Sequence, residues 1–67
     1  MRKLRYYNLY KIRLEYTPAG KLAQVPSFLG SYPTKEKADV ALDDAVREWE
    51  ANGSPAGVSF RLEPFYQ

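Results

Sequence analysis

Three aspartates on one predicted helix are the residues of this sequence best placed to do chemistry. Asp39 and Asp43 are four residues apart, which puts both carboxylates on one face of a helix, and Asp44 follows directly. Such a pair could bind a divalent cation or share a proton. Sites of this kind normally take a further ligand from another element and lie in a pocket, for which a domain of this size has little room. We therefore expect a solvated acidic helix face and no metal site.

Other kinds of catalytic site lack a necessary partner residue. The 67-residue sequence contains no histidine and no cysteine, so its serines have no imidazole base, and there is no thiolate nucleophile or disulfide framework. The segment from Gly53 to Gly57 has no phosphate-binding pattern and does not open a helix. The sequence thus predicts a protein that is not an enzyme and that holds no cofactor.

The first half of the chain predicts a hairpin. Tyr10, Ile12, Leu14 and Tyr16 alternate with polar residues, so they share one strand face, which we expect to pack on the helix. Extended backward, the alternation predicts an opposite face that is basic and partly aromatic, with Arg5, Tyr7, Leu9, Lys11, Arg13 and Glu15. Proline and glycine in the segment 17–21 predict a turn. A second strand over about 22–29 contains Pro26, which suits the edge of a sheet.

The second half predicts a helix and a third strand. Thr34 is a good N-cap, and the helix should run to about Ala51. Its apolar stripe has helical spacing and comprises Ala38, Ala41, Leu42, Ala45, Val46 and Trp49. A third strand follows over 58–63, with its odd-numbered residues facing outward, and Pro64 is expected to end it. The predicted fold class is α+β: a small ββαβ domain with a three-stranded, mainly antiparallel sheet of order 2-1-3 and one helix packed on one face.

Length and composition are typical of one small domain, which we expect to span residues 1–67. Hydrophobic residues make up 45% of the chain, a generous supply for a core without disulfides or metals. No apolar run is long enough for a membrane span, and the first residues do not resemble a signal peptide. We expect a cytoplasmic protein that is a monomer or a weak dimer and has no membrane partner.

Charge is divided unevenly along the chain, although the net charge is only +2. The first thirteen residues carry five bases and no acid, whereas the segment 35–50 carries six acids against three bases. Each surface could steer a partner of opposite sign. Exposed aromatic residues beside lysine and arginine are typical of a contact surface. The predicted partner-binding residues are Tyr7, Lys11, Arg13 and Arg61 on the sheet and Glu36, Asp39, Asp43 and Asp44 on the helix.

The end of the chain resembles a known inhibitor. Residues 55–57, Pro-Ala-Gly, followed by the strand residues 58–64, are similar to the corresponding stretch of the small T7-type phage inhibitor of bacterial RNA polymerase. That family is a short ββαβ protein that binds the polymerase jaw and blocks promoter opening. The resemblance implies that Arg61 matches the first of the family's two final-strand arginines. The second position is Glu63 here, which puts the family's target in doubt for this chain.

A second resemblance covers the middle of the chain. Residues 25–34, the alanines and Trp49 of the helix, and Asn52-Gly53-Ser54-Pro55 are similar to the HicB-type antitoxin domain. That domain neutralises a small toxin ribonuclease. Both resemblances imply a protein that blocks another protein.

We therefore expect a non-catalytic protein-binding module, a phage-type inhibitor or adaptor acting on a larger protein such as RNA polymerase or another nucleic-acid enzyme, in the host cytoplasm if it is phage-encoded. The alternative is a small nucleic-acid-binding module, in which the basic aromatic sheet face neutralises phosphates and stacks on bases. An acidic helix and the small net charge favour the first.

Overall fold

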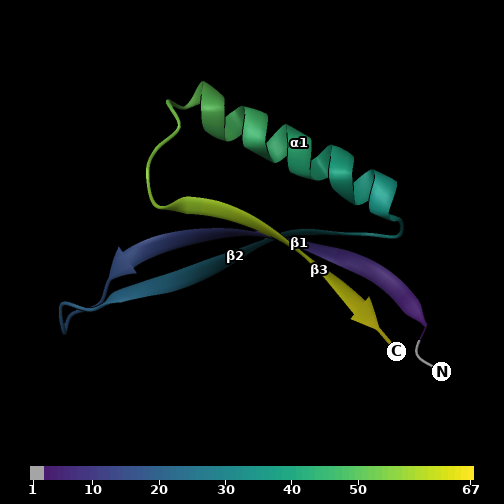
Figure 1. Cartoon of the computed structure of the whole chain (residues 1–67), viewed down its shortest axis with the longest axis horizontal. Helices are drawn as coiled ribbons and strands as arrows, with labels where there is room; N and C mark the ends of the chain where they lie inside the picture. Colours follow the sequence, from purple (N-terminus) through teal and green to yellow (C-terminus); the bar gives the residue numbers. More distant parts are fainter. Residues whose placement is uncertain (1–2) are drawn as a thin grey trace.

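The structure is a computed structural model that describes residues 3–67. Within this range the chain forms three strands and one helix, in the order β1 (Leu4–Tyr16), β2 (Leu22–Tyr32), α1 (Lys35–Ala51) and β3 (Val58–Tyr66). The sheet order is β2-β1-β3, and both strand pairings are antiparallel. The predicted small α+β fold is therefore confirmed, with α1 on one face of the sheet (Figure 1).

The helix forms where the sequence predicts it. The Thr34 side chain accepts a hydrogen bond of 3.2 Å from the backbone N–H of Lys37, which satisfies one of the unpaired donors of the first turn. Ala38 is fully buried, and the rest of the predicted apolar stripe is half-buried. Gly53, with φ +92°, follows the C-cap Asn52 and turns the chain toward β3.

The strands are longer than the alternation predicts. Pro26 lies on β2, at one edge of the sheet, as expected. Pro64 does not end β3, because β3 forms the other edge, where a residue without an N–H is tolerated. The strand continues to Tyr66, and Lys3 and Gln67 exchange two backbone hydrogen bonds of 2.9 and 3.0 Å beyond it.

The helix packs on the face of β1 opposite to the one predicted. Leu9, only 1% exposed, lies beneath α1, and Lys11 lies beside Trp49 of the helix and Phe60 of β3. Tyr10 and the other residues expected to face the helix therefore point away from it. Alternation shows which residues share a face but not which face meets the helix, and both faces of β1 carry apolar residues. The faces of β3 were predicted correctly.

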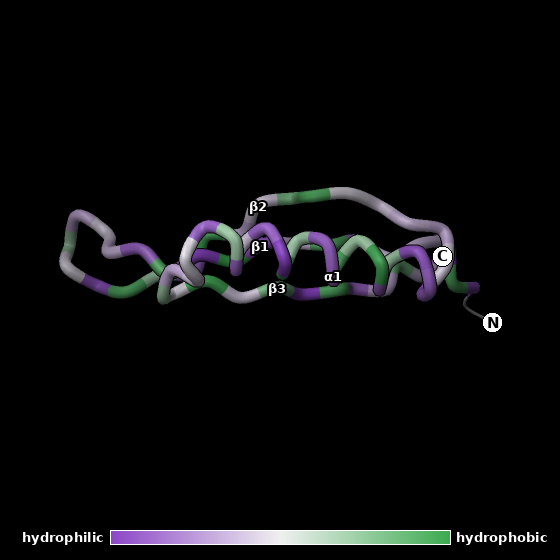
Figure 2. Tube along the Cα trace, turned by 90° about the horizontal axis from the view of Figure 1, so that it is seen from above, coloured by the Kyte–Doolittle hydropathy of each residue, from purple (hydrophilic) through white to green (hydrophobic). Residues whose placement is uncertain are grey.

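The sheet is strongly twisted, and β1 arches beneath α1 so that both of its ends bend away from the helix (Figure 1). We call the face opposite α1 the underside; β1 contributes its even-numbered residues from Tyr6 to Tyr16 to it. Seen from above, α1 lies over β1 and β3, while β2 bows out to one side (Figure 2). One helix thus leaves both the underside and part of β2 uncovered.

Candidate groove between the helix and strand β2

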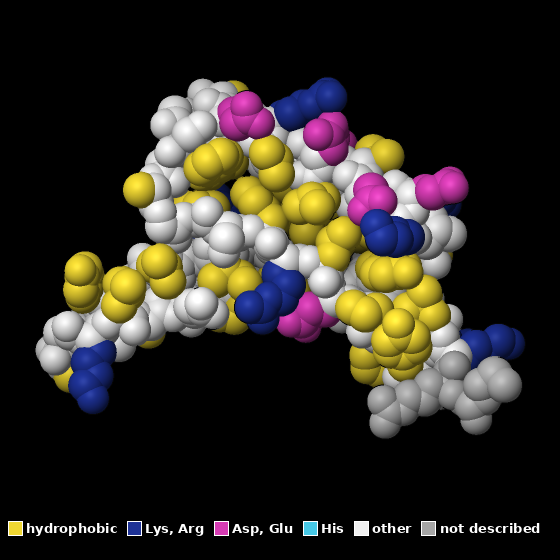
Figure 3. All heavy atoms as spheres, viewed as in Figure 1, with side chains coloured by type: hydrophobic (Ala, Val, Ile, Leu, Met, Phe, Trp, Pro, Cys, Tyr) yellow, Lys and Arg dark blue, Asp and Glu magenta, His cyan; other side chains and the backbone are white. Residues whose placement is uncertain are grey.

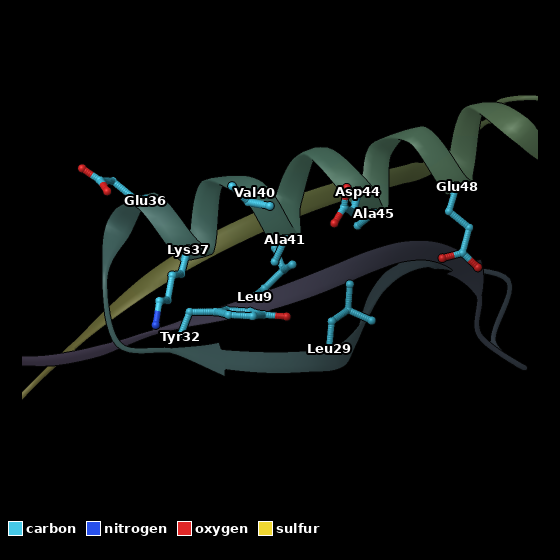
Figure 4. Close-up of a pocket in the computed structure, with 10 residues that line it drawn as sticks. All are labelled: Leu9, Leu29, Tyr32, Glu36, Lys37, Val40, Ala41, Asp44, Ala45 and Glu48. Carbon is cyan, nitrogen blue, oxygen red and sulfur yellow. The ribbon is translucent and has the colours of Figure 1, made fainter.

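The uncovered part of β2 borders a groove of about 780 Å³ along α1 (Figure 4). Leu9 of β1 and Leu29 and Tyr32 of β2 line its sheet side. The helix contributes the other wall, with Glu36, Lys37, Val40, Ala41, Asp44, Ala45 and Glu48. The sheet side of the groove is apolar apart from the Tyr32 hydroxyl, and the charged side chains come from α1, with Lys37 and Glu48 pointing down toward the sheet (Figure 4).

A β-bulge places Leu29 in the groove. The pairing of β1 with β2 shifts from Leu9 opposite Gly30 to Tyr10 opposite Phe28, so Leu29 is an extra residue on β2. Leu29 remains 43% exposed although it borders the helix side of the sheet. The bulge therefore adds an apolar side chain at the point where β2 bows away from α1.

Gly30 makes room for the tyrosine that forms part of the floor. A Cβ atom at Gly30 would lie 2.8 Å from the hydroxyl oxygen of Tyr32, closer than carbon and oxygen atoms can approach. Without that Cβ, the Tyr32 ring lies along the strand beneath the helix (Figure 4). A larger residue at position 30 would therefore displace the Tyr32 ring from this part of the groove floor.

The helix wall is a ridge with a spacing of four residues. Glu36, Val40, Asp44 and Glu48 follow each other along one side of α1, which is the i±4 row used in helix packing. Val40 is 63% exposed and lies outside the buried stripe of the helix. This ridge presents one apolar and three acidic side chains to whatever occupies the groove.

Ion pairing separates the helix acids into two groups. Asp39 pairs with Lys35 at 3.1 Å, and Asp43 pairs with Arg47 at 2.9 Å, both on the exposed surface of α1. Within residues 3–67, no salt bridge involves the three ridge acids Glu36, Asp44 and Glu48. Three of the helix acids without a salt bridge, Glu36, Asp44 and Glu48, therefore border the groove.

The predicted basic contact residues do not form one surface. Tyr7, Lys11 and Arg13 share a face of β1 with Leu9, on the helix side, whereas Arg61 pairs with Tyr10 and faces the underside. Two of these bases also have acidic neighbours on their own strands: Arg13 lies 3.5 Å from Glu15, and Arg61 lies 3.3 Å from Glu63. The prediction of one basic, aromatic sheet face opposite the helix was wrong, because the odd-numbered residues of β1 face the helix and not away from it.

The predicted acidic contact residues are divided between two sites. Glu36 and Asp44 border the groove, while Asp39 and Asp43 lie on the outer side of the helix in ion pairs. Sequence reasoning missed Glu48, Val40 and the three groove residues of the sheet. The spacing of Glu36, Val40, Asp44 and Glu48 is visible in the sequence, but the bulge that opens the groove beside them is not.

Comparisons with protein-family models, curated proteins and solved structures found no match for this chain. The resemblances to the phage polymerase inhibitor and to the antitoxin domain stay predictions. Across residues 3–67, no helix is long and apolar enough to cross a membrane, and no three acidic residues are grouped so that they could hold a metal ion.

Proposed function

We propose that this chain is a non-catalytic protein-binding module that takes an amphipathic, basic helix of a larger protein into the groove between α1 and β2. The observation that carries the proposal is the ridge of unpaired acids above an apolar floor. A helix lying in a hydrophobic groove is a common mode of protein recognition, in which apolar residues at helical spacing anchor the ligand.

The shape of the groove suits a helix. The helix α1 covers β1 and β3 but not the bowed part of β2 (Figure 2). A second helix beside α1 would lie at an interaxial distance of about 8–10 Å and would cover Leu29 and Val40, which are 43% and 63% exposed. Its side chains would interdigitate with the four-residue ridge of α1. The occupant would thus complete the helical layer of the domain.

The charge of the groove selects a basic occupant. Glu36, Asp44 and Glu48 outnumber Lys37 along the helix wall. Lysine or arginine residues that flank the apolar stripe of the bound helix would lie against these acids, and each exposed pair would contribute about 0.2–1 kcal/mol. The charges would also raise the association rate, and their effect would fall with added salt.

We further propose that binding inhibits or redirects a larger enzyme, with bacterial RNA polymerase as the first candidate. The sequence resemblance of residues 55–64 to the phage inhibitor supports this choice. Arg61 is paired with Glu63, so the groove, and not the final strand, would carry the main contact. Binding of purified polymerase to immobilised protein, weakened by substitutions in the groove, is the expected result. Because the bases of β1 and Arg61 face opposite sides, no observation favours the nucleic-acid alternative.

The groove can be tested with designed helical peptides before a partner is known. The probe has leucine at helical spacing and lysine at the flanking positions, and the matched peptide carries glutamate in place of lysine. In an NMR titration at low salt, the lysine peptide should shift the backbone amides of 29–32 and 36–48. The glutamate peptide should leave them unchanged.

Two triple variants separate the groove from the general charge of the helix. Glu36→Gln, Asp44→Asn and Glu48→Gln remove three acids from the groove, whereas Asp39→Asn, Asp43→Asn and Glu50→Gln remove three acids elsewhere on α1. Three lost pairs at about 0.2–1 kcal/mol each should weaken peptide binding about threefold or more in the first set, and we expect the second set to change it less than about twofold. Equal loss in both variants, or shifts confined to the underside, would contradict the proposal.

A further inference from the structure

The underside is an exposed apolar surface that is separate from the groove. Among residues 3–67, nine large apolar side chains are exposed, and five of them lie on the underside: Leu14, Tyr16, Leu22, Phe28 and Phe65. Aromatic pairs extend along it. The rings of Tyr6 and Phe65 are stacked with centroids 4.8 Å apart, and Tyr10 meets Phe28 edge to face at 5.8 Å. Apolar side chains crowd both ends of the arched sheet in Figure 3.

The charge of the underside is balanced. Of the strand residues whose pairing places them on it in the described chain, Arg61 and Glu63 are the charged ones, and their side chains lie 3.3 Å apart. An interface between identical subunits is typically poor in charged residues and more apolar than the remaining surface. The underside has this character, whereas the acidic groove does not.

The chain exposes more surface to solvent than is typical of a folded monomeric protein of the same mass. Its accessible surface is 5253 Å², whereas the scaling for folded monomers gives about 4,300 Å² at this mass. The excess of about 900 Å² is close to the roughly 800 Å² that each partner contributes to a standard interface. On the underside, the aromatic residues Tyr16, Phe28 and Phe65 are 78%, 60% and 45% exposed, so a second copy could bury much of their area.

We propose that two copies of this chain associate underside to underside about a twofold axis. Such an interface must be complementary to itself, and a face that carries one arginine beside one glutamate meets this condition, because Arg61 of each copy can approach Glu63 of the other. The two sheets would pack at about 10 Å, with the aromatic side chains between them. Both helices would lie on the outside, so the dimer would present two grooves. The inference does not depend on what binds in the grooves.

Sedimentation equilibrium of the full chain over a range of concentrations tests the proposal. We expect the wild type to reach twice the 7.7 kDa monomer mass. Phe28→Glu should raise the dimer dissociation constant at least about 30-fold, because it places a charge among the aromatic side chains of the underside. Val40→Glu is the matched control; it introduces the same charge at a residue of similar exposure in the groove and should leave the constant unchanged. Circular dichroism checks that both variants fold.

A charge swap tests the twofold geometry. Arg61→Glu alone should weaken the dimer, since each copy would then present two acids, and the double variant Arg61→Glu, Glu63→Arg should restore it. A wild type that stays monomeric at the highest attainable concentration would overturn the proposal, as would a dimer weakened by Val40→Glu and not by Phe28→Glu. A photo-crosslinker at Phe28 that reacts with a different protein in cells, and not with a second copy, would also overturn it.

Discussion

Replacing Leu9 by alanine should destabilise the domain far more than the same change at Leu14. Leu9 is 1% exposed beneath α1, so its truncation removes buried methyl groups and leaves a cavity, at a cost of about 3 kcal/mol. Leu14, on the same strand but facing the underside, is 45% exposed, so it loses only part of the transfer free energy and leaves no enclosed cavity. We expect a cost of about 1 kcal/mol there.

These costs are large for a domain of this length. A total stability of about 3–10 kcal/mol is typical for 67 residues, so Leu9→Ala would remove a large share of it. The melting temperature should fall by about 12–24 °C for Leu9→Ala and by about 4–8 °C for Leu14→Ala. Both residues lie on β1 and undergo the same change, so the difference in strand preference between leucine and alanine largely cancels when the two variants are compared.

Urea denaturation followed by Trp49 fluorescence measures the free energy of unfolding of both variants. This tryptophan is a suitable probe because its indole, on α1, contacts the loop before β3. The protein should be dilute enough to dissociate the proposed dimer, because a dimer would bury Leu14. If Leu14→Ala cost more than Leu9→Ala under these conditions, the helix would pack on the face of β1 that carries the even-numbered residues, and the assignment of the two faces would be refuted.

Three further substitutions test individual contacts. Thr34→Ala should cost about 1 kcal/mol in urea denaturation through loss of the helix N-cap, and Thr34→Ser should retain most of that stability. Trp49→Phe should cost about 1–2 kcal/mol by the same measurement, because the indole N–H donates a 3.0 Å hydrogen bond to the Pro55 carbonyl that phenylalanine cannot replace. Gly30→Ala should move the Tyr32 ring out of the groove floor and weaken the lysine peptide about fivefold in the NMR titration, with little change in melting temperature. An unchanged peptide affinity in Gly30→Ala would show that Tyr32 does not shape the binding surface.

The elements and the sheet order could be predicted because local signals were strong. Thr34 and the alanine-rich stripe define the helix, and Pro26 marks an edge strand, which leaves β1 in the middle. The end of β3 was predicted too early, because Pro64 was interpreted as a residue that ends the strand. A proline on an edge strand is compatible with continuation, and only the pairing with β1 shows that the strand goes on.

The faces and the groove could not be predicted, because they depend on how elements pack. Leu9 and Ile12 point to opposite sides of the sheet, yet both are buried, at 1% and 6% exposed. Hydrophobicity alone therefore does not show which of them meets the helix. The extra residue Leu29 on β2 has no distinctive local pattern, although it helps to open the groove. Two of the four predicted acids, Glu36 and Asp44, border that groove.

The position of one helix explains why this small domain has two different exposed apolar surfaces. A single helix is too narrow to cover a strongly twisted sheet of three strands, so β2 is left open beside α1 and the underside is left open entirely (Figures 1 and 2). The acids of the helix give the first surface a negative rim, while the second is neutral. Charge opposes the packing of one groove against another but not of one underside against another. The same chain can therefore associate with itself through the underside and still keep the groove available for a basic partner.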